Sequence, residues 1–213
     1  MKTDELIALL AHDVAPVERH VAGRRYAGAL GLGALASTVL MLATLGIRPD
    51  LAAAAHLPMF WVKLGFAGAL AAASLLAVLR LSRPGARLDG VPIVLAAPVL
   101  LIWALAVFEL WQADPGQRLA LVLGTTWKVC PVLIAMLAVP VFAGSLWAMR
   151  GLAPARLGLA GAAAGLLAGS VAALVYCLHC PELEAPFIGI WYLLGMLIPA
   201  LAGGLSARAL LRW

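Results

Sequence analysis

Three cysteines are the residues of this sequence whose type and spacing could carry chemistry. Cys177 and Cys180 stand three positions apart in the run Tyr-Cys-Leu-His-Cys-Pro, and Cys130 ends the run Thr-Trp-Lys-Val-Cys. Thiolates react with oxidants and bind soft metal ions. Three pairings are open, because the local pair is close in sequence and Cys130 could bridge to either partner within a Cα separation of about 7 Å. The competing interpretation is three buried, inert thiols that pack as small apolar side chains.

Histidine and charged residues give weaker evidence for a functional site than the cysteines do. His179 precedes Cys180, and His56 falls on the same predicted side, so the two could add ligands for a soft metal such as zinc. Lys63, Glu109 and Lys128 fall near the ends of apolar runs, where we expect long side chains to reach the membrane interface.

No apolar run carries a charge at its middle, which disfavours an ion-coupled transporter. We find no phosphate-binding glycine loop, HExxH motif or Ser-His-Asp arrangement, so the sequence predicts neither an enzyme nor a cofactor.

The elements that must position these residues are predicted to be membrane-spanning helices. Of the 213 residues, 64% are hydrophobic and 12% are charged, whereas soluble domains are about half apolar and about a quarter charged. A span needs about 20 apolar residues. Six runs qualify, and they predict an all-α, six-helix membrane domain over residues 27–213, with spans at about 27–47, 58–79, 91–111, 126–149, 157–178 and 186–205.

The distribution of basic residues predicts the orientation of this bundle. Six spans place both termini on one side, and 11 of the 15 Lys and Arg residues fall there; the other four are Arg48, Lys63, Arg118 and Lys128. By the positive-inside rule, both termini are cytoplasmic. All three cysteines then fall on the opposite side, the periplasm or cell exterior, where disulfides can persist.

Residues 1–26 form a separate N-terminal segment before the six-helix membrane domain. Leu6, Ile7, Leu10 and Val14 share one face of a predicted helix that Pro16 interrupts. The segment holds four acidic and four basic residues, so it is no polybasic tether for lipid or nucleic acid. Two interpretations stay open: the helix lies on the bilayer, or it docks into a groove of a cytoplasmic protein.

The fifth span contains Gly161, Gly165 and Gly169 at intervals of four. Small residues at this spacing line one helix face and let another backbone come close. We expect packing within the bundle rather than a dimer contact.

Four short runs, spread over nearly the whole chain, are specific enough to compare with known families. They are the opening Met-Lys-Thr-Asp-Glu-Leu-Ile, Pro58-Met-Phe-Trp-Val-Lys-Leu, Gly124-Thr-Thr-Trp-Lys-Val-Cys and Leu178-His-Cys-Pro-Glu. In these runs the chain resembles the NrsF-like family of bacterial inner-membrane anti-sigma factors. The resemblance implies six transmembrane helices and a bound extracytoplasmic-function sigma factor of the sigma-F type. It also implies two periplasmic-side cysteines that sense metal or oxidative stress. Carried over, these are Cys130 and Cys180, and Cys177 is an extra thiol that could compete for either partner.

These lines combine into one hypothesis. The N-terminal helix, through Leu6, Ile7 and Leu10, holds the sigma factor at the bacterial inner membrane, with no direct contact to nucleic acid. A metal or oxidant acts on Cys130 and Cys180, with His179 as a further metal ligand, and shifts the fourth and fifth spans. The alternative is a quinone-linked thiol-disulfide oxidoreductase that uses Cys177 and Cys180. Such an enzyme would normally need a second redox pair, and only Cys130 is left.

Overall fold

The structure of the protein is a computed structural model that describes residues 3, 5, 21–83, 87–150, 152, 154 and 156–210. In these ranges every regular element is helical, and six helices are long and apolar enough to cross a membrane. The predicted all-α fold with six candidate spans is therefore confirmed.

The spans are α2 (Val21–Thr44), α4 (Pro58–Leu81), α5 (Val91–Gln112), α7 (Cys130–Arg150), α8 (Leu157–Tyr176), and a last span built from α9 (Ala185–Phe187), η1 (Ile188–Tyr192) and α10 (Leu193–Leu210). Two short helices, α3 (Leu51–Ala54) and α6 (Arg118–Leu123), lie between spans. The helix α2 begins inside the range 1–26, because Arg24 and Arg25 end the apolar run without breaking a helix.

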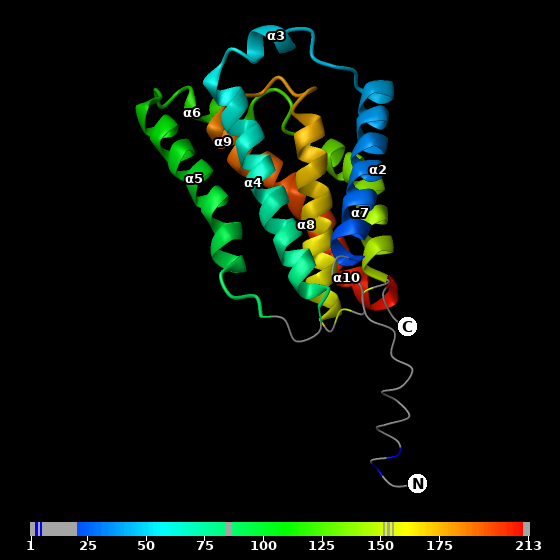
Figure 1. Ribbon diagram of the computed structural model, residues 1–213. Coiled ribbons are helices and arrows are strands. Elements are labelled where there is room, and N and C mark those ends of the chain that lie inside the picture. The colour runs from blue at the N-terminus through cyan, green and yellow to red at the C-terminus, as the bar shows by residue number, and fades with distance from the viewer. Residues whose placement is uncertain are drawn as a thin grey trace.

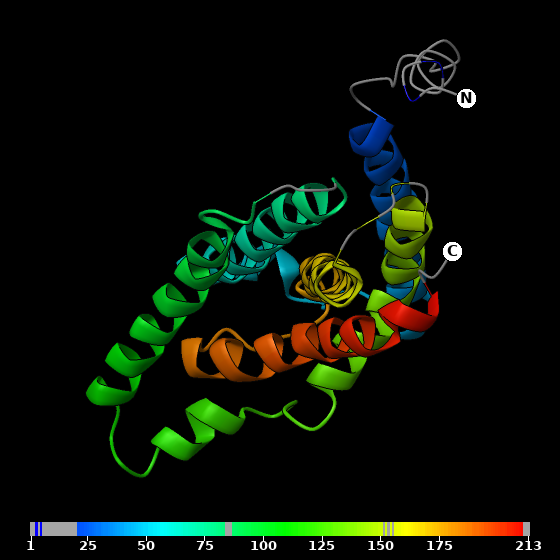
Figure 2. The ribbon, with the colours of Figure 1, turned by 90° about the horizontal axis from the view of Figure 1, so that it is seen from below.

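The helix α8 lies at the centre of the bundle. It contacts α4, α7 and α10, and Figure 2 shows it between these three helices. By contrast, α5 lies at the periphery beside α4 and α9. This arrangement explains why most of α8 is buried while most of α5 faces outward.

Glycines let α8 and α10 approach closely. A Cβ atom added at Gly161 would collide with the backbone of Gly203, and one at Gly165 would collide with the carbonyl of Pro199. Gly169 faces Met196 in the same way, with a hypothetical Cβ 2.7 Å from its Cα atom. The expectation that the glycine stripe packs within the bundle is confirmed, since its partners belong to the same chain.

The two ends of the bundle carry different elements. The short helices α3, α6 and α9 lie at one end, which we call the α3/α6 end, whereas α2 begins and α10 ends at the opposite end (Figure 1). The described cysteines all belong to the α3/α6 end, because α7 begins there and α8 ends there. Which end faces the cytoplasm stays a prediction.

Candidate functional site

The three cysteines are gathered in the core at the α3/α6 end. Cys130 is the first residue of α7, Cys177 follows the last residue of α8, and Cys180 lies in the loop before α9. All three side chains are 0% exposed and belong to one hydrophobic cluster. All three are free thiols. A reagent must therefore be small, or it must enter when this loop opens locally.

Of the three pairings, the structure brings Cys130 and Cys180 together. Their thiols lie within hydrogen-bonding reach, although they come from segments 50 positions apart in the sequence. The hydrogen bond with Cys130 and the positive charge of Lys63 lower the pKa of the Cys180 thiol. Burial instead raises the pKa of Cys177 to about 12. Cys180 is therefore the sulfur best suited to react as a thiolate.

Lys63 is a fully buried lysine next to this pair. It lies in α4, its side chain is 0% exposed, and its Nζ atom donates to the carbonyl oxygens of Cys180 at 3.0 Å and Glu182 at 2.8 Å. Its Nζ atom also lies 4.8 Å from the centroid of the Tyr192 ring. The expectation that Lys63 reaches the membrane interface is wrong, because the loop after α8 folds over its end and supplies carbonyl acceptors.

Arg48 is the second buried cation of the site. Its Nη1 atom donates to the carbonyl oxygens of Cys180 at 3.2 Å and Pro181 at 3.4 Å. Its Nε and Nη2 atoms each donate to a different carboxylate oxygen of Asp50 at 2.7 Å. These bonds raise the pKa of Arg48 and hold the pKa of Asp50 below its usual range. Arg48 is thus an ion-paired cation that also forms hydrogen bonds with the backbone of the Cys180 loop.

His179 binds the chain segment that follows α2. Its Nδ1 atom donates to the carbonyl oxygen of Gly46 at 3.0 Å, and the Arg48 backbone N–H donates to the Leu178 carbonyl at 3.1 Å. His56 is exposed. Nowhere in the described ranges do three His, Cys, Asp or Glu side chains group so as to hold a metal ion. A metal site that includes His179 stays a prediction.

Glu182 ties the two cysteine-bearing loops together. Its Oε1 atom accepts hydrogen bonds from the backbone N–H and hydroxyl of Thr125, at 2.7 and 2.6 Å, and from those of Thr126, at 3.2 and 3.3 Å. Gly124 makes this contact feasible, because it adopts φ +54° and a Cβ there would lie 2.7 Å from the Glu182 Oε2 atom. The start of α7 is therefore held against the Cys180 loop.

A π-helical turn supplies the last wall of the site. The π-helix η1 ends at Tyr192, whose fully buried ring packs on Tyr176 with centroids 5.8 Å apart. Trp103 donates from its Nε1 atom to the Gly189 carbonyl of this turn at 3.0 Å. Such turns are frequent at functional sites, because the extra residue redirects side chains. Here the turn places an aromatic ring against Lys63.

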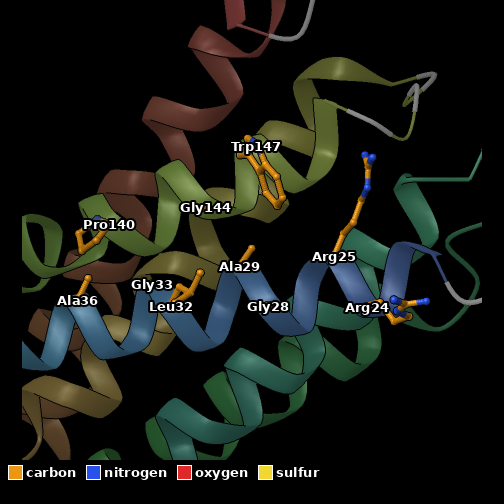
Figure 3. A pocket seen from close by; sticks show the side chains of 10 residues that line it. All are labelled: Arg24, Arg25, Gly28, Ala29, Leu32, Gly33, Ala36, Pro140, Gly144 and Trp147. Atoms are coloured by element: carbon orange, nitrogen blue, oxygen red, sulfur yellow. The ribbon is translucent and has the colours of Figure 1, made fainter.

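A groove of about 780 Å³ lies far from the cysteines, between α2 and α7 (Figure 3). The two helices come close along it, since a Cβ at Gly33 would lie 2.8 Å from the Val141 Cα atom and one at Gly144 would lie 3.0 Å from the Ala29 carbonyl. Its lining contains no cysteine, histidine or acidic residue, so it offers no groups for metal or redox chemistry; the lining is Arg24, Arg25, Gly28, Ala29, Leu32, Gly33, Ala36, Pro140, Gly144 and Trp147.

The residues predicted to bind a sigma factor, Leu6, Ile7 and Leu10, lie outside the described residues. Sequence reasoning also missed the roles of Lys63, Arg48 and Glu182. The signal for Lys63 was present, since a lysine inside an apolar run is costly unless it is paired or functional, but its partners come from a distant loop.

Comparisons with known proteins agree on one family. The model of the family described as negative regulator of sigma F matches residues 10–213. A probable anti-sigma-F factor from Azospira oryzae is 61% identical over 213 residues, which cover 100% of both chains. An anti-sigma-F factor from Caulobacter vibrioides is 44% identical over 217 aligned positions, again with 100% of both chains covered. No solved structure matches the chain.

Proposed function

The chain belongs to the family of negative regulators of sigma F, and from this premise we propose that it sequesters an extracytoplasmic-function sigma factor at the bacterial inner membrane. In this proposal the α3/α6 end faces the periplasm and α2 begins in the cytoplasm. The sigma factor is released when oxidative stress converts Cys130 and Cys180 into a disulfide. The protein is a regulator rather than an enzyme.

The single observation that carries the sensing part is the contact between Cys130 and Cys180. These thiols lie within hydrogen-bonding reach, and buried Lys63 lies beside them. A disulfide needs Cα atoms within about 7 Å and suitably aimed Cβ atoms, so a preformed contact lets the bond form with little rearrangement. Because the described residues bring no third metal-ligating side chain to this pair, disulfide formation is the chemistry that the site supports best.

The route from the cysteines to the other end of the bundle runs through α2. The segment Gly46–Arg48 follows α2 directly and bonds to the Cys180 loop through His179, Leu178 and Arg48. The helix α2 also packs closely on α7, which begins at Cys130. Both cysteines therefore act on α2, one through the loop and one through α7. The hypothesis of a shift in the fourth and fifth spans is thereby extended to the first span.

At its other end, α2 begins at Val21 and continues from the segment proposed to hold the sigma factor. A rigid-body shift or rotation of α2 would change how this segment presents Leu6, Ile7 and Leu10. An allosteric mechanism requires two states whose affinities for the partner differ. We propose that the reduced bundle is the tight-binding state and the disulfide-bonded bundle the weak one.

The first test is co-purification from the native host. A C-terminally tagged full-length chain, extracted in mild detergent, should bring down a stoichiometric sigma factor that mass spectrometry identifies. The triple variant L6A/I7A/L10A should lose it, whereas L119A, which alters an exposed leucine of α6, should keep it. Purification of the wild-type protein without any sigma factor would contradict the proposal.

The second test addresses the cysteines. Peroxide treatment should release sigma factor from the wild-type protein and from C177S, but not from the C130S/C180S variant. Release from the double variant at the wild-type dose would refute the sensing role. The same preparations exposed to a soft divalent cation instead of peroxide would show whether metal binding is a second input.

The oxidoreductase alternative finds little support in the geometry. Its exchanging pair would be Cys177 and Cys180, yet Cys177 is fully buried and has a raised pKa. Thiol exchange with another protein requires an accessible thiolate.

A further inference from the structure

Lys63 is the charged group of this site that neither the family name nor the pairing of cysteines explains. A lysine that is 0% exposed is costly to bury unless its charge is compensated. Its hydrogen-bond partners are two neutral carbonyls and its ring contact is Tyr192. Within the described ranges, no carboxylate forms an ion pair with it.

Among the described residues, the carboxylates close to Cys180 are directed to partners other than Lys63. The Glu182 carboxylate is directed to Thr125 and Thr126, and Arg48 is matched by Asp50. Ionisable groups from every surrounding element face the Cys180 sulfur. Two are cations, Lys63 of α4 and Arg48 after α2. The others are Cys130 of α7, Tyr176 and Cys177 at the end of α8, and Tyr192 of η1. The group that can carry a compensating negative charge for buried Lys63 is therefore the Cys180 sulfur.

We propose that Lys63 is a positioning residue of the sensor, whose buried charge makes Cys180 the sulfur that an oxidant attacks. This inference rests on the proposed function and deepens it. Lys63 acts in two ways. Its two hydrogen bonds hold the backbone of the Cys180 loop, and its positive charge stabilises negative charge on the Cys180 sulfur.

The oxidant in this step is a hydroperoxide, here hydrogen peroxide. The Cys180 thiolate attacks one oxygen, so that an S–O bond forms, the O–O bond breaks and hydroxide leaves. Cys130 then attacks the sulfenic acid sulfur; the S–S bond forms, the S–O bond breaks, and the departing hydroxide takes the Cys130 proton as water. The hydroxide from the first step takes a proton from solvent. The two sulfurs lose two electrons, and peroxide is reduced to two waters.

Two substitutions separate the charge of Lys63 from its hydrogen bonds. K63Q keeps amide donors for the carbonyls of Cys180 and Glu182 but removes the charge, whereas K63R keeps the charge. K128Q is the matched control, because Lys128 is an exposed lysine at the same end of the bundle. The full-length protein in detergent is treated with hydrogen peroxide over a range of pH, and the Cys130–Cys180 disulfide is quantified by mass spectrometry.

We expect K63Q to form the disulfide about tenfold more slowly at neutral pH and its rate profile to move up by about one pH unit, since one pKa unit is a tenfold change in thiolate. K63R and K128Q should stay within about threefold of wild type. A wild-type rate and pH profile in K63Q would overturn the proposal, and so would K63R behaving like K63Q.

A measurement on the unsubstituted lysine keeps the proposal testable if K63Q does not fold. At neutral pH, the wild-type protein should show more ultraviolet thiolate absorbance than C180S, and this difference reports the Cys180 thiolate. Equal absorbance of the two proteins would overturn the proposal. If the wild-type protein forms no Cys130–Cys180 disulfide, both this inference and the proposed sensing function fail. If the wild-type disulfide forms but K63Q matches it, only the role of Lys63 fails.

Discussion

Replacing Glu182 by glutamine should loosen the contact between the loops that carry Cys130 and Cys180. One carboxylate oxygen accepts four hydrogen bonds from Thr125 and Thr126, two of them at 2.6 and 2.7 Å. Glutamine is nearly the same shape and keeps one acceptor oxygen, but it removes the negative charge. The substitution therefore tests the charge-assisted part of these bonds and leaves the packing in place.

The expected size of this effect follows from the geometry. Hydrogen bonds to a charged group contribute about 1.5–3 kcal/mol, against about 0.5–1.5 kcal/mol for neutral pairs. The two bonds from Thr126 are long, at 3.2 and 3.3 Å, and Glu182 is half-buried, so water screens part of the charge. We expect a net loss of about 1–1.5 kcal/mol, which is a change of about tenfold in a local opening equilibrium.

Hydrogen exchange measures this opening directly. The amides of Thr125 and Thr126 donate to Glu182, so their exchange should become about tenfold faster in E182Q. The variant D114N removes an exposed acid from the same end of the bundle and should leave both amides unchanged. Unaltered exchange of Thr125 and Thr126 in E182Q would refute the idea that this carboxylate clamps the two loops.

Three further predictions follow from other contacts. R48M should release less sigma factor than the wild-type protein at equal disulfide content, which parallel mass spectrometry and co-purification can measure. C177S should leave disulfide yield unchanged, because burial raises the pKa of this thiol to about 12 and leaves it protonated at neutral pH. G165A should lower the thermal unfolding midpoint by the equivalent of about 1–3 kcal/mol, since its Cβ would meet the Pro199 backbone, whereas G65A, in open space, should not.

The sequence was sufficient for the helices because membrane spans are defined by length and apolarity. A run such as Val91–Gln112 has no alternative that satisfies its backbone in lipid. The common placement of Cys130 and Cys180 followed from counting, since alternate loops of a multi-span chain return to the same side. The short helices α3 and α6 and the π-turn at Tyr192 were not predicted, because such elements depend on tertiary contacts rather than on periodicity.

The polar part of the site could not be predicted for a related reason. Hydropathy places Lys63 near the end of a span but does not say which face of α4 it occupies or what covers it. Its burial depends on a loop more than 100 positions later, whose carbonyls accept its hydrogen bonds. Arg48 poses the same difficulty, because its contact with Cys180 joins segments 132 positions apart. Long-range polar contacts of this kind leave no local pattern in one sequence.

The free energy of signalling explains why Arg48 matters to the output. A shift of sigma occupancy from 99:1 to 1:99 requires about 5.5 kcal/mol, whereas a disulfide typically contributes about 2–4 kcal/mol. From a starting point of about 1% free sigma factor, the disulfide alone would free between about a quarter and nine-tenths of it. The hydrogen bonds from Arg48 to the Cys180 loop can supply the remainder, at about 1.5–3 kcal/mol for a charged donor.

The sign of this contribution follows from the connection to α2. Once the disulfide moves the loop, Arg48 keeps its bonds to Cys180 and Pro181 only if the end of α2 moves with it. These bonds then favour the shifted position of α2 by about their own free energy. R48M removes that coupling without preventing the disulfide, so the difference in release between wild type and R48M at equal disulfide content measures it. Equal release would mean that the cysteines act through α7 alone.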